Sequence, residues 1–190
     1  GLFHSGVCKA LMEQDLMPKV LSGSSAGAIM AGMLGTSNPS EFQRILAGET
    51  FFSEAFRFRD TKDLLRGNGG LADVKYLKTF LIENLGDLTF SEALEKSGLH
   101  INVAVAPYDG SQNARIMNAY TAPNLLVLSA VLASCAVPVL FPAVRLTSKN
   151  RDGEHTPYMA NTRWVDGSER SDFPQEKMSR LYNLNYTIAS

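Results

Sequence analysis

The 190-residue sequence has few of the residues that mark specialised protein classes: two cysteines, three histidines and one tryptophan. Cys8 and Cys135 each lie in an apolar helical pattern, which favours free buried thiols and leaves a disulfide between them open. Neither cysteine has metal-ligand spacing to the other or to a histidine, and the carboxylates and histidines show no tight ligand cluster, so we expect no metal. We also expect no cofactor.

Charge of one sign and long hydrophobic runs are also absent. The net charge is −1, and no cluster of five or six like charges occurs, which argues against nucleic acid as a partner. No apolar run reaches the roughly 18 residues of a membrane-spanning helix. No signal peptide is visible, and the chain begins at Gly1 within a helical pattern, so we interpret it as part of a longer protein.

The composition that is present, 45% hydrophobic and 19% charged, is that of a folded protein. Hydrophobic spacing predicts helices over 2–14, 26–34, 39–46, 51–60, 73–84, 89–98 and 125–137. For 51–60 a lipid-facing aromatic patch is the alternative to a core-facing helix. Thr89 or Ser91 would cap the helix that ends at Gly98.

Strands are expected over 20–22, 99–107, 114–121, 163–166 and 182–190. This alternation predicts one α/β domain with a mainly parallel sheet covered by helices on both faces.

A Gly-x-Ser-x-Gly motif lies between the expected strand at 20–22 and the apolar helix after it. At such a junction the motif is the sequence form of a nucleophile elbow, a turn that holds its serine in a sparsely populated backbone conformation. The turn needs little bulk two residues either side of the serine, and Gly23 and Gly27 meet this need. Ser25 is the candidate nucleophile, although a plain glycine-serine turn before a buried helix also fits.

A serine nucleophile needs a base to accept its proton. His4 begins the first helix, His100 opens a strand and His155 lies in a polar loop. None of them follows Asp166, so the chain lacks a triad in the α/β-hydrolase order, where histidine comes last. Asp166 is the remaining candidate, because it follows a short strand and Gly167 allows a tight turn. Taken alone, the Asp-Gly dipeptide fits an ordinary turn better than a base.

Five segments resemble the patatin-like acyl hydrolases, and most closely the branch that includes triacylglycerol lipases. In order they are GLFHSGVCKAL, VLSGSSAGAIMA, LTFSEALEKSG, TAPNLLVLSAVLASCAVPVLFPAV and WVDGSERSDFP. The resemblance covers nearly the whole chain and implies a three-layer α/β sandwich. It also implies a Ser–Asp dyad without histidine, with the serine in the elbow and the aspartate in the Asp-Gly motif. These positions are Ser25 and Asp166.

In this family the oxyanion hole comes from a glycine-rich loop that would precede Gly1. The sequence therefore lacks most of the oxyanion donors, and the N–H of Ala26, the residue after the nucleophile, is the donor that the motif places here. The chain also stops at Ser190, inside an expected strand. We interpret residues 1–190 as a single patatin-like catalytic domain truncated at both ends.

The resemblance implies a serine acyl hydrolase that cleaves phospholipid or acylglycerol esters through an acyl-enzyme. Two alternatives stay open: an inactive lipid-binding or scaffolding domain of the same fold, and an acyltransferase that uses the same acyl-enzyme. Each implies a lipid partner at a membrane or lipid-droplet surface and an intracellular protein peripheral to that surface. The sequence does not predict the head group, the acyl-chain length or the oligomeric state.

Overall fold

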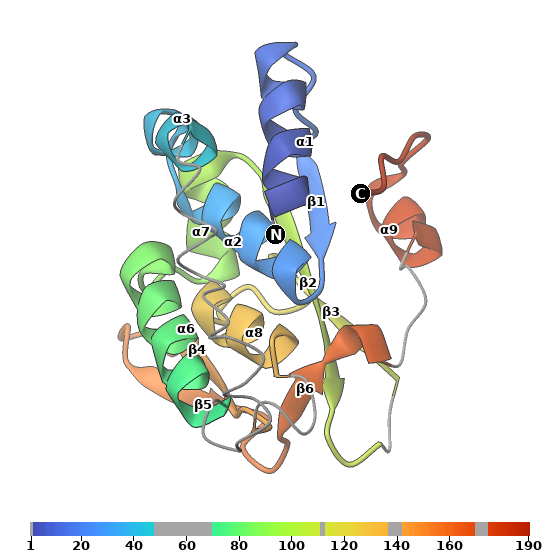
Figure 1. Cartoon of the computed structure of the whole chain (residues 1–190). Coiled ribbons are helices and arrows are strands. Elements are labelled where there is room, and N and C mark those ends of the chain that lie inside the picture. The colour runs from blue at the N-terminus through green and yellow to red at the C-terminus, as the bar shows by residue number, and fades with distance from the viewer. Residues whose placement is uncertain (1, 48–69, 111–112, 137–141, 170–174) are drawn as a thin grey trace.

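A computed structural model of the chain describes residues 2–47, 70–110, 113–136, 142–169 and 175–190. The expected helix at 51–60 lies outside them. Figure 1 shows the arrangement of the elements. The helices are α1 (Leu2–Glu13), α2 (Ala26–Thr36), α3 (Pro39–Ala47), α6 (Gly70–Leu85), α7 (Phe90–Ser97), α8 (Val127–Ser134), the 3-10 helix η1 (Gly167–Glu169) and α9 (Gln175–Tyr182). The strands are β1 (Val20–Gly23), β2 (His100–Pro107), β3 (Arg115–Met117), β4 (Leu146–Lys149), β5 (His155–Tyr158) and β6 (Trp164–Asp166).

β2 is the central strand of the main sheet. β1 pairs with its first half in parallel, whereas β3 and β6 are antiparallel to it. The α/β class is thus confirmed, but the described sheet is mixed rather than mainly parallel. For β3 the reason lies in the length of the connection, because residues 108–114 are too few for the long crossover that a parallel pair needs.

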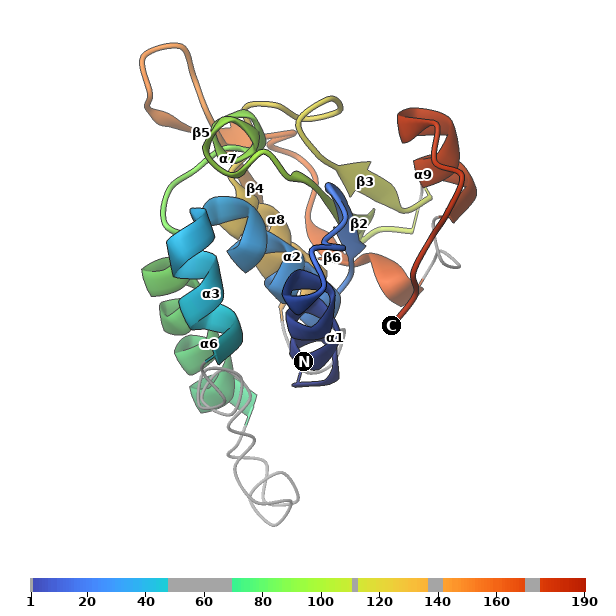
Figure 2. The ribbon, with the colours of Figure 1, turned by 90° about the horizontal axis from the view of Figure 1, so that it is seen from above.

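Helices cover both faces of the sheet, as expected for three layers. Alternate β2 residues, Ile101, Val103 and Val105, lie in the main hydrophobic core with α2 and α8. Asn102, between them in sequence, accepts a hydrogen bond from the hydroxyl of Tyr182 on α9, 2.9 Å away. Figure 2 shows α9 on the opposite side of the sheet from α2 and α8.

Most expected helices are confirmed, and α7 shows why its ends were readable in the sequence. Thr89 is its N-cap: the side chain of Thr89 accepts from the N–H of Glu92, and the Glu92 carboxylate accepts from the N–H of Thr89. Gly98 ends the helix in the left-handed conformation, with φ 70°. Of the two expected caps, the structure therefore selects Thr89 over Ser91.

Three expected elements are wrong or too long. The helix expected from Leu125 begins only at Val127, because the N–H of Leu126 donates to Thr147 in an extended segment. The strand expected over 114–121 ends at Met117, since the side chain of Asn118 accepts two backbone N–H groups and turns the chain. Residues 183–190 form no strand with the described residues, and Asn183, with φ 53°, follows the end of α9.

Candidate active site

Ser25 lies in the turn between β1 and α2, as the motif predicts. Its backbone angles, φ 49° and ψ −120°, are those of a residue held outside the ordinary regions. Such a conformation costs about 1–3 kcal/mol and persists only where the surrounding structure fixes it. The strained elbow predicted at this serine is therefore confirmed, while its role as nucleophile stays a prediction.

The two glycines of the motif differ in what they permit. A Cβ on Gly23 would lie 2.2 Å from the carbonyl carbon of Gly27 and 2.6 Å from the N of Ala28, so the turn cannot close with a larger residue. A Cβ on Gly27 would meet nothing within 4 Å. The expected steric need is thus found at Gly23 and is wrong for Gly27, because one glycine is enough for the two backbone segments to touch.

The peptide groups of Ser25 are held from two directions. Its N–H donates to the Oγ of Ser134 at 3.0 Å, and its carbonyl oxygen accepts the N–H of Ile29 at 3.1 Å. The Sγ of Cys135 lies 3.7 Å from the same carbonyl oxygen. By contrast, the N–H of Ala26 has no hydrogen-bond partner among the described residues. It is therefore available to a bound group, as an oxyanion donor would have to be.

Asp166 ends β6 and is 2% exposed. Its Oδ1 accepts the N–H of Ser168 at 2.9 Å, and its own N–H donates to the carbonyl oxygen of Ala136 at 3.1 Å. A Cβ on Gly167 would lie 2.7 Å from the carbonyl carbon of Ala104, on β2. Gly167 is thus required because the chain passes directly against β2, a stronger constraint than the tight turn expected from the sequence.

The strand register places Ser25 and Asp166 along one edge of β2. Gly23, at the end of β1, is opposite Val103, and Asp166 is opposite Val105. β6 must lie on the same edge as β1, because β3 occupies the other edge of Val103 and Val105. Two residues along a strand span roughly 7 Å. The fold therefore brings the two candidate residues into the same region, where Figure 1 shows β6 running toward the start of α2.

Ser25 and Asp166 are not hydrogen-bonded to each other in the part of the chain that the structure describes. The thiol of Cys135 lies 3.7 Å from the carbonyl oxygen of Ser25. Burial, and then the negative charge of Asp166, raise the pKa of Cys135 to about 12. The segment from Ser134 to Ala136 thus contacts Ser25 at one end and the backbone of Asp166 at the other.

The three histidines lie in other environments. His4 Nδ1 is 2.9 Å from the Oγ of Ser190, and His100 stacks on Tyr120. His155 lies on β5 and pairs with Asp87 at 2.8 Å, so its expected position in a loop is wrong. None of the three forms a hydrogen bond with Ser25 in the described structure.

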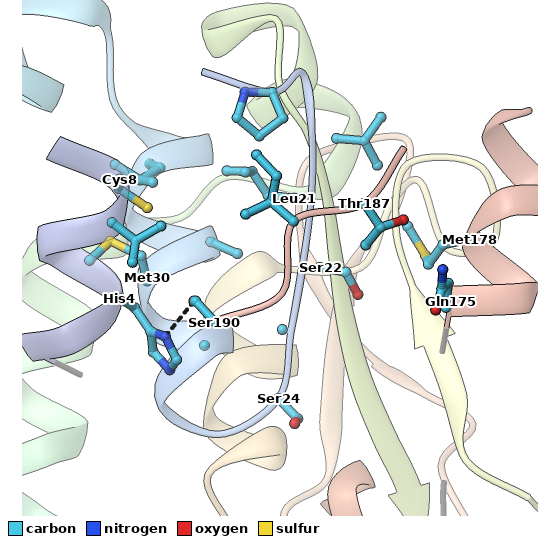
Figure 3. Close-up of a pocket in the computed structure, with 18 of the residues that line it drawn as sticks. His4, Cys8, Leu21, Ser22, Ser24, Met30, Gln175, Met178, Thr187 and Ser190 are labelled. Carbon is cyan, nitrogen blue, oxygen red and sulfur yellow. Dashed lines mark hydrogen bonds between the residues drawn. The ribbon is translucent and has the colours of Figure 1, made fainter. Parts of the chain in front are cut away.

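A cavity of about 780 Å³ extends along β1 to the elbow (Figure 3). Its walls come from α1, β1, α2 and the segment 183–190, and they include the apolar side chains of Val7, Met30 and Leu34. Gly27 and Gly167 lie among its lining residues, although Ser25 and Asp166 do not. Sequence reasoning missed this cavity, since its lining comes from separate segments and no single pattern signals it.

The described residues contain no group of three or more His, Cys, Asp or Glu side chains that could hold a metal ion. Within the same ranges, each helix is too short or too polar to cross a bilayer.

A strained serine in a strand-to-helix turn of an α/β sandwich is typical of proteins with a nucleophile elbow. The model of one protein family, patatin-like phospholipase, matches residues 1–178 of this chain. The chain therefore belongs to the patatin-like phospholipase family.

Three curated relatives match this whole chain. Triacylglycerol lipase 4 of Saccharomyces cerevisiae is 38% identical, with 22% of its own length covered. Triacylglycerol lipase SDP1L of Arabidopsis thaliana is 32% identical, with 26% covered. Triacylglycerol lipase ptl2 of Schizosaccharomyces pombe is 31% identical, with 31% covered. The chain thus spans less than a third of the length of these relatives.

Proposed function

We propose that this chain is the catalytic domain of a lipid acyl hydrolase, with Ser25 as nucleophile and Asp166 as base. The observation that carries the proposal is the strained Ser25 in the turn after β1, followed along the same edge of β2 by the buried carboxylate of Asp166. The family and the relatives named triacylglycerol lipase support lipid esters, of phospholipids or acylglycerols, as the substrate class.

In the proposed reaction, Ser25 Oγ attacks the ester carbonyl carbon while its proton passes to the carboxylate of Asp166. The carbonyl oxygen becomes an oxyanion, which the N–H of Ala26 stabilises. The bond to the alcohol then breaks, and the alcohol leaves with the proton from Asp166. Water attacks the resulting acyl-enzyme and gives a proton to Asp166, which returns it to Ser25 Oγ as the fatty acid leaves.

This sequence of steps requires contact between Ser25 Oγ and Asp166, whose Oδ1 accepts the N–H of Ser168 in the structure. Hydrogen bonds between catalytic groups are often long without ligand and tighten when substrate binds. We expect the contact to form on binding of the ester, beside the edge of β2 with which β1 and β6 both pair. A location at the surface of an intracellular membrane or lipid droplet is part of the same proposal.

The cavity along β1 supports a lipid substrate, because it brings an apolar lining to the elbow. Its volume lies within the range of small-molecule sites. Gly27 faces open space where its side chain would be, so the cavity reaches the turn beside Ser25. An acyl chain bound there would keep its ester close to the elbow.

The test is reaction of the full-length protein with a fluorophosphonate, followed by peptide mapping of the modified residue. We expect modification at Ser25, its loss in Ser25→Ala and its retention in Ser24→Ala, the matched control in the same turn. Free fatty acid is the expected product from an acylglycerol. Absence of modification in a folded protein that still binds lipid would favour the non-catalytic lipid-binding domain instead.

A further inference from the structure

Ser134, the last residue of α8, contacts the elbow from a distant part of the chain. It is fully buried, and its Oγ both accepts the N–H of Ser25 at 3.0 Å and donates to the carbonyl oxygen of Ala104 at 2.8 Å. A hydroxyl has a single proton, so donation to Ala104 turns its lone pairs toward Ser25. The Ser134 hydroxyl therefore connects the elbow to β2 in one orientation.

This contact satisfies a group that the following helix cannot. Ser25 is the N-cap of α2, where backbone N–H groups have no partner within the helix. Its φ of 49° also needs surroundings that hold it. Ser134 supplies the partner for the N–H, and the Sγ of Cys135 lies 3.7 Å from the carbonyl oxygen of the same residue.

The segment that holds Ser25 also holds the candidate base. The carbonyl oxygen of Ala136 accepts the N–H of Asp166 at 3.1 Å, two residues after Ser134. A shift of this segment would therefore change the position of Ser25 relative to Asp166. Within this segment the hydroxyl of Ser134 makes the shorter hydrogen bond to the elbow, at 3.0 Å, against 3.7 Å for the thiol of Cys135.

We propose that Ser134 is a positioning residue, whose hydroxyl fixes the elbow so that Ser25 Oγ is aligned with Asp166. By binding the N–H of Ser25, it also leaves the N–H of Ala26 as the elbow amide that stabilises the oxyanion. This inference rests on the proposed acyl hydrolase function. It assigns to α8 a role in the reaction that neither the elbow motif nor the Asp-Gly motif contains.

The test compares Ser134→Ala with Ser129→Ala in the full-length protein. Ser129 is a matched control, because it is also a buried serine of α8 whose Oγ accepts a backbone N–H, that of Thr147 at 2.8 Å. Both variants leave one backbone N–H without its partner, but only Ser134 contacts the elbow. The measurements are kcat and KM for a short-chain p-nitrophenyl ester, the rate of fluorophosphonate labelling, and the melting temperature.

We expect both variants to melt at a lower temperature than the wild type. Only Ser134→Ala should lose activity, with kcat and the labelling rate lowered about 10- to 100-fold at nearly unchanged KM, as misplacement of a reacting group predicts. If Ser134→Ala does not fold, Ser134→Cys keeps the size of the side chain with a poor acceptor, and the same loss is expected.

Equal kcat values in the Ser134 and Ser129 variants of an active protein would overturn the positioning role and leave the proposed function standing. A wild-type protein that neither hydrolyses the ester nor reacts with the fluorophosphonate would overturn both proposals.

Discussion

At the scale of single residues, the conformation of the turn at Ser25 depends both on its own motif and on side chains from distant parts of the sequence. The sequence motif was enough to predict Ser25 at a strained strand-to-helix junction, because the requirement is local and is met within five residues. The motif wrongly predicted that Gly27 is needed for steric reasons. A Cβ at Gly27 would meet no atom within 4 Å, and the residue lines the cavity. The motif also could not indicate Ser134, because a hydrogen bond between residues so distant in sequence follows from tertiary packing and leaves no local pattern.

The two glycines of the elbow should respond differently to the same substitution. Gly23→Ala places a methyl group against the backbone of Gly27 and Ala28, and we expect a loss of stability of about 1–3 kcal/mol or more. Gly27→Ala meets open space and should leave the stability unchanged or raise it slightly, since alanine favours helices. Urea unfolding of both variants measures the difference. Equal losses would contradict this account of the turn.

The two thiols should differ in reactivity. Cys135 is 6% exposed with its pKa raised to about 12, whereas Cys8 is only partly buried, and desolvation raises its pKa as well. At pH 8, we expect iodoacetamide to modify Cys8 well before Cys135, because the thiolate is the reactive form. Mass spectrometry of the native protein over time gives both rates. Rapid modification of Cys135 would count against its place in the core.

Cys135 also predicts a pH dependence of stability. Its pKa is 9.0 in the unfolded reference and about 12 when folded, so the folded state holds the proton more tightly. The contribution of Cys135 to stability is therefore complete below pH 9 and is lost as the pH rises toward 12. Comparison of urea unfolding at pH 8 and pH 10.5 measures this loss, which should be smaller in Cys135→Ala. If Cys135→Ala lost as much stability between pH 8 and pH 10.5 as the wild type, the pH dependence would come from other titratable groups.

Among the elements, those with complete local signals were predictable and those that depend on distant pairing were not. α7 carries its cap and its stop in its own sequence. The β4–β5 hairpin was missed, because the polar residues from 148 to 161 read as a loop and its register is set by cross-strand pairing. For 182–190, a strand-like pattern was misleading, since a strand needs a neighbour to pair with.

The capping box of α7 gives a direct test at this scale. Thr89→Ala removes the acceptor for the N–H of Glu92 and should lower stability by about 1 kcal/mol. Ser91→Ala is the matched control, since Ser91 lies within the helix and does not cap it. Thermal or urea unfolding distinguishes the two variants. A larger loss for Ser91→Ala would contradict the assignment of Thr89 as the cap.

For the whole molecule, the position of β2 is decisive, because it pairs with β1, which leads into the turn of Ser25, and with β6, which ends at Asp166. The alternation of helices and strands predicted an α/β domain, but it did not reveal the antiparallel direction of β6. Asp166 shows the same limit, since its local sequence is that of any Asp-Gly turn. The lack of a suitably placed histidine left Asp166 as a candidate, but only the resemblance to patatin-like acyl hydrolases favoured a base over an ordinary turn. The fold then places Asp166 on the same edge of β2 as the elbow.

The central claim, that Asp166 is the base for Ser25, is tested most directly by the acylation rate of Asp166→Asn. The amide has nearly the same shape, so the circular dichroism spectrum should be unchanged, but it cannot accept the proton. We expect the single-turnover rate of acylation by a p-nitrophenyl ester to fall by about 10²–10⁴-fold. A folded Asp166→Asn protein that acylates at the wild-type rate would contradict the dyad and require another base for Ser25.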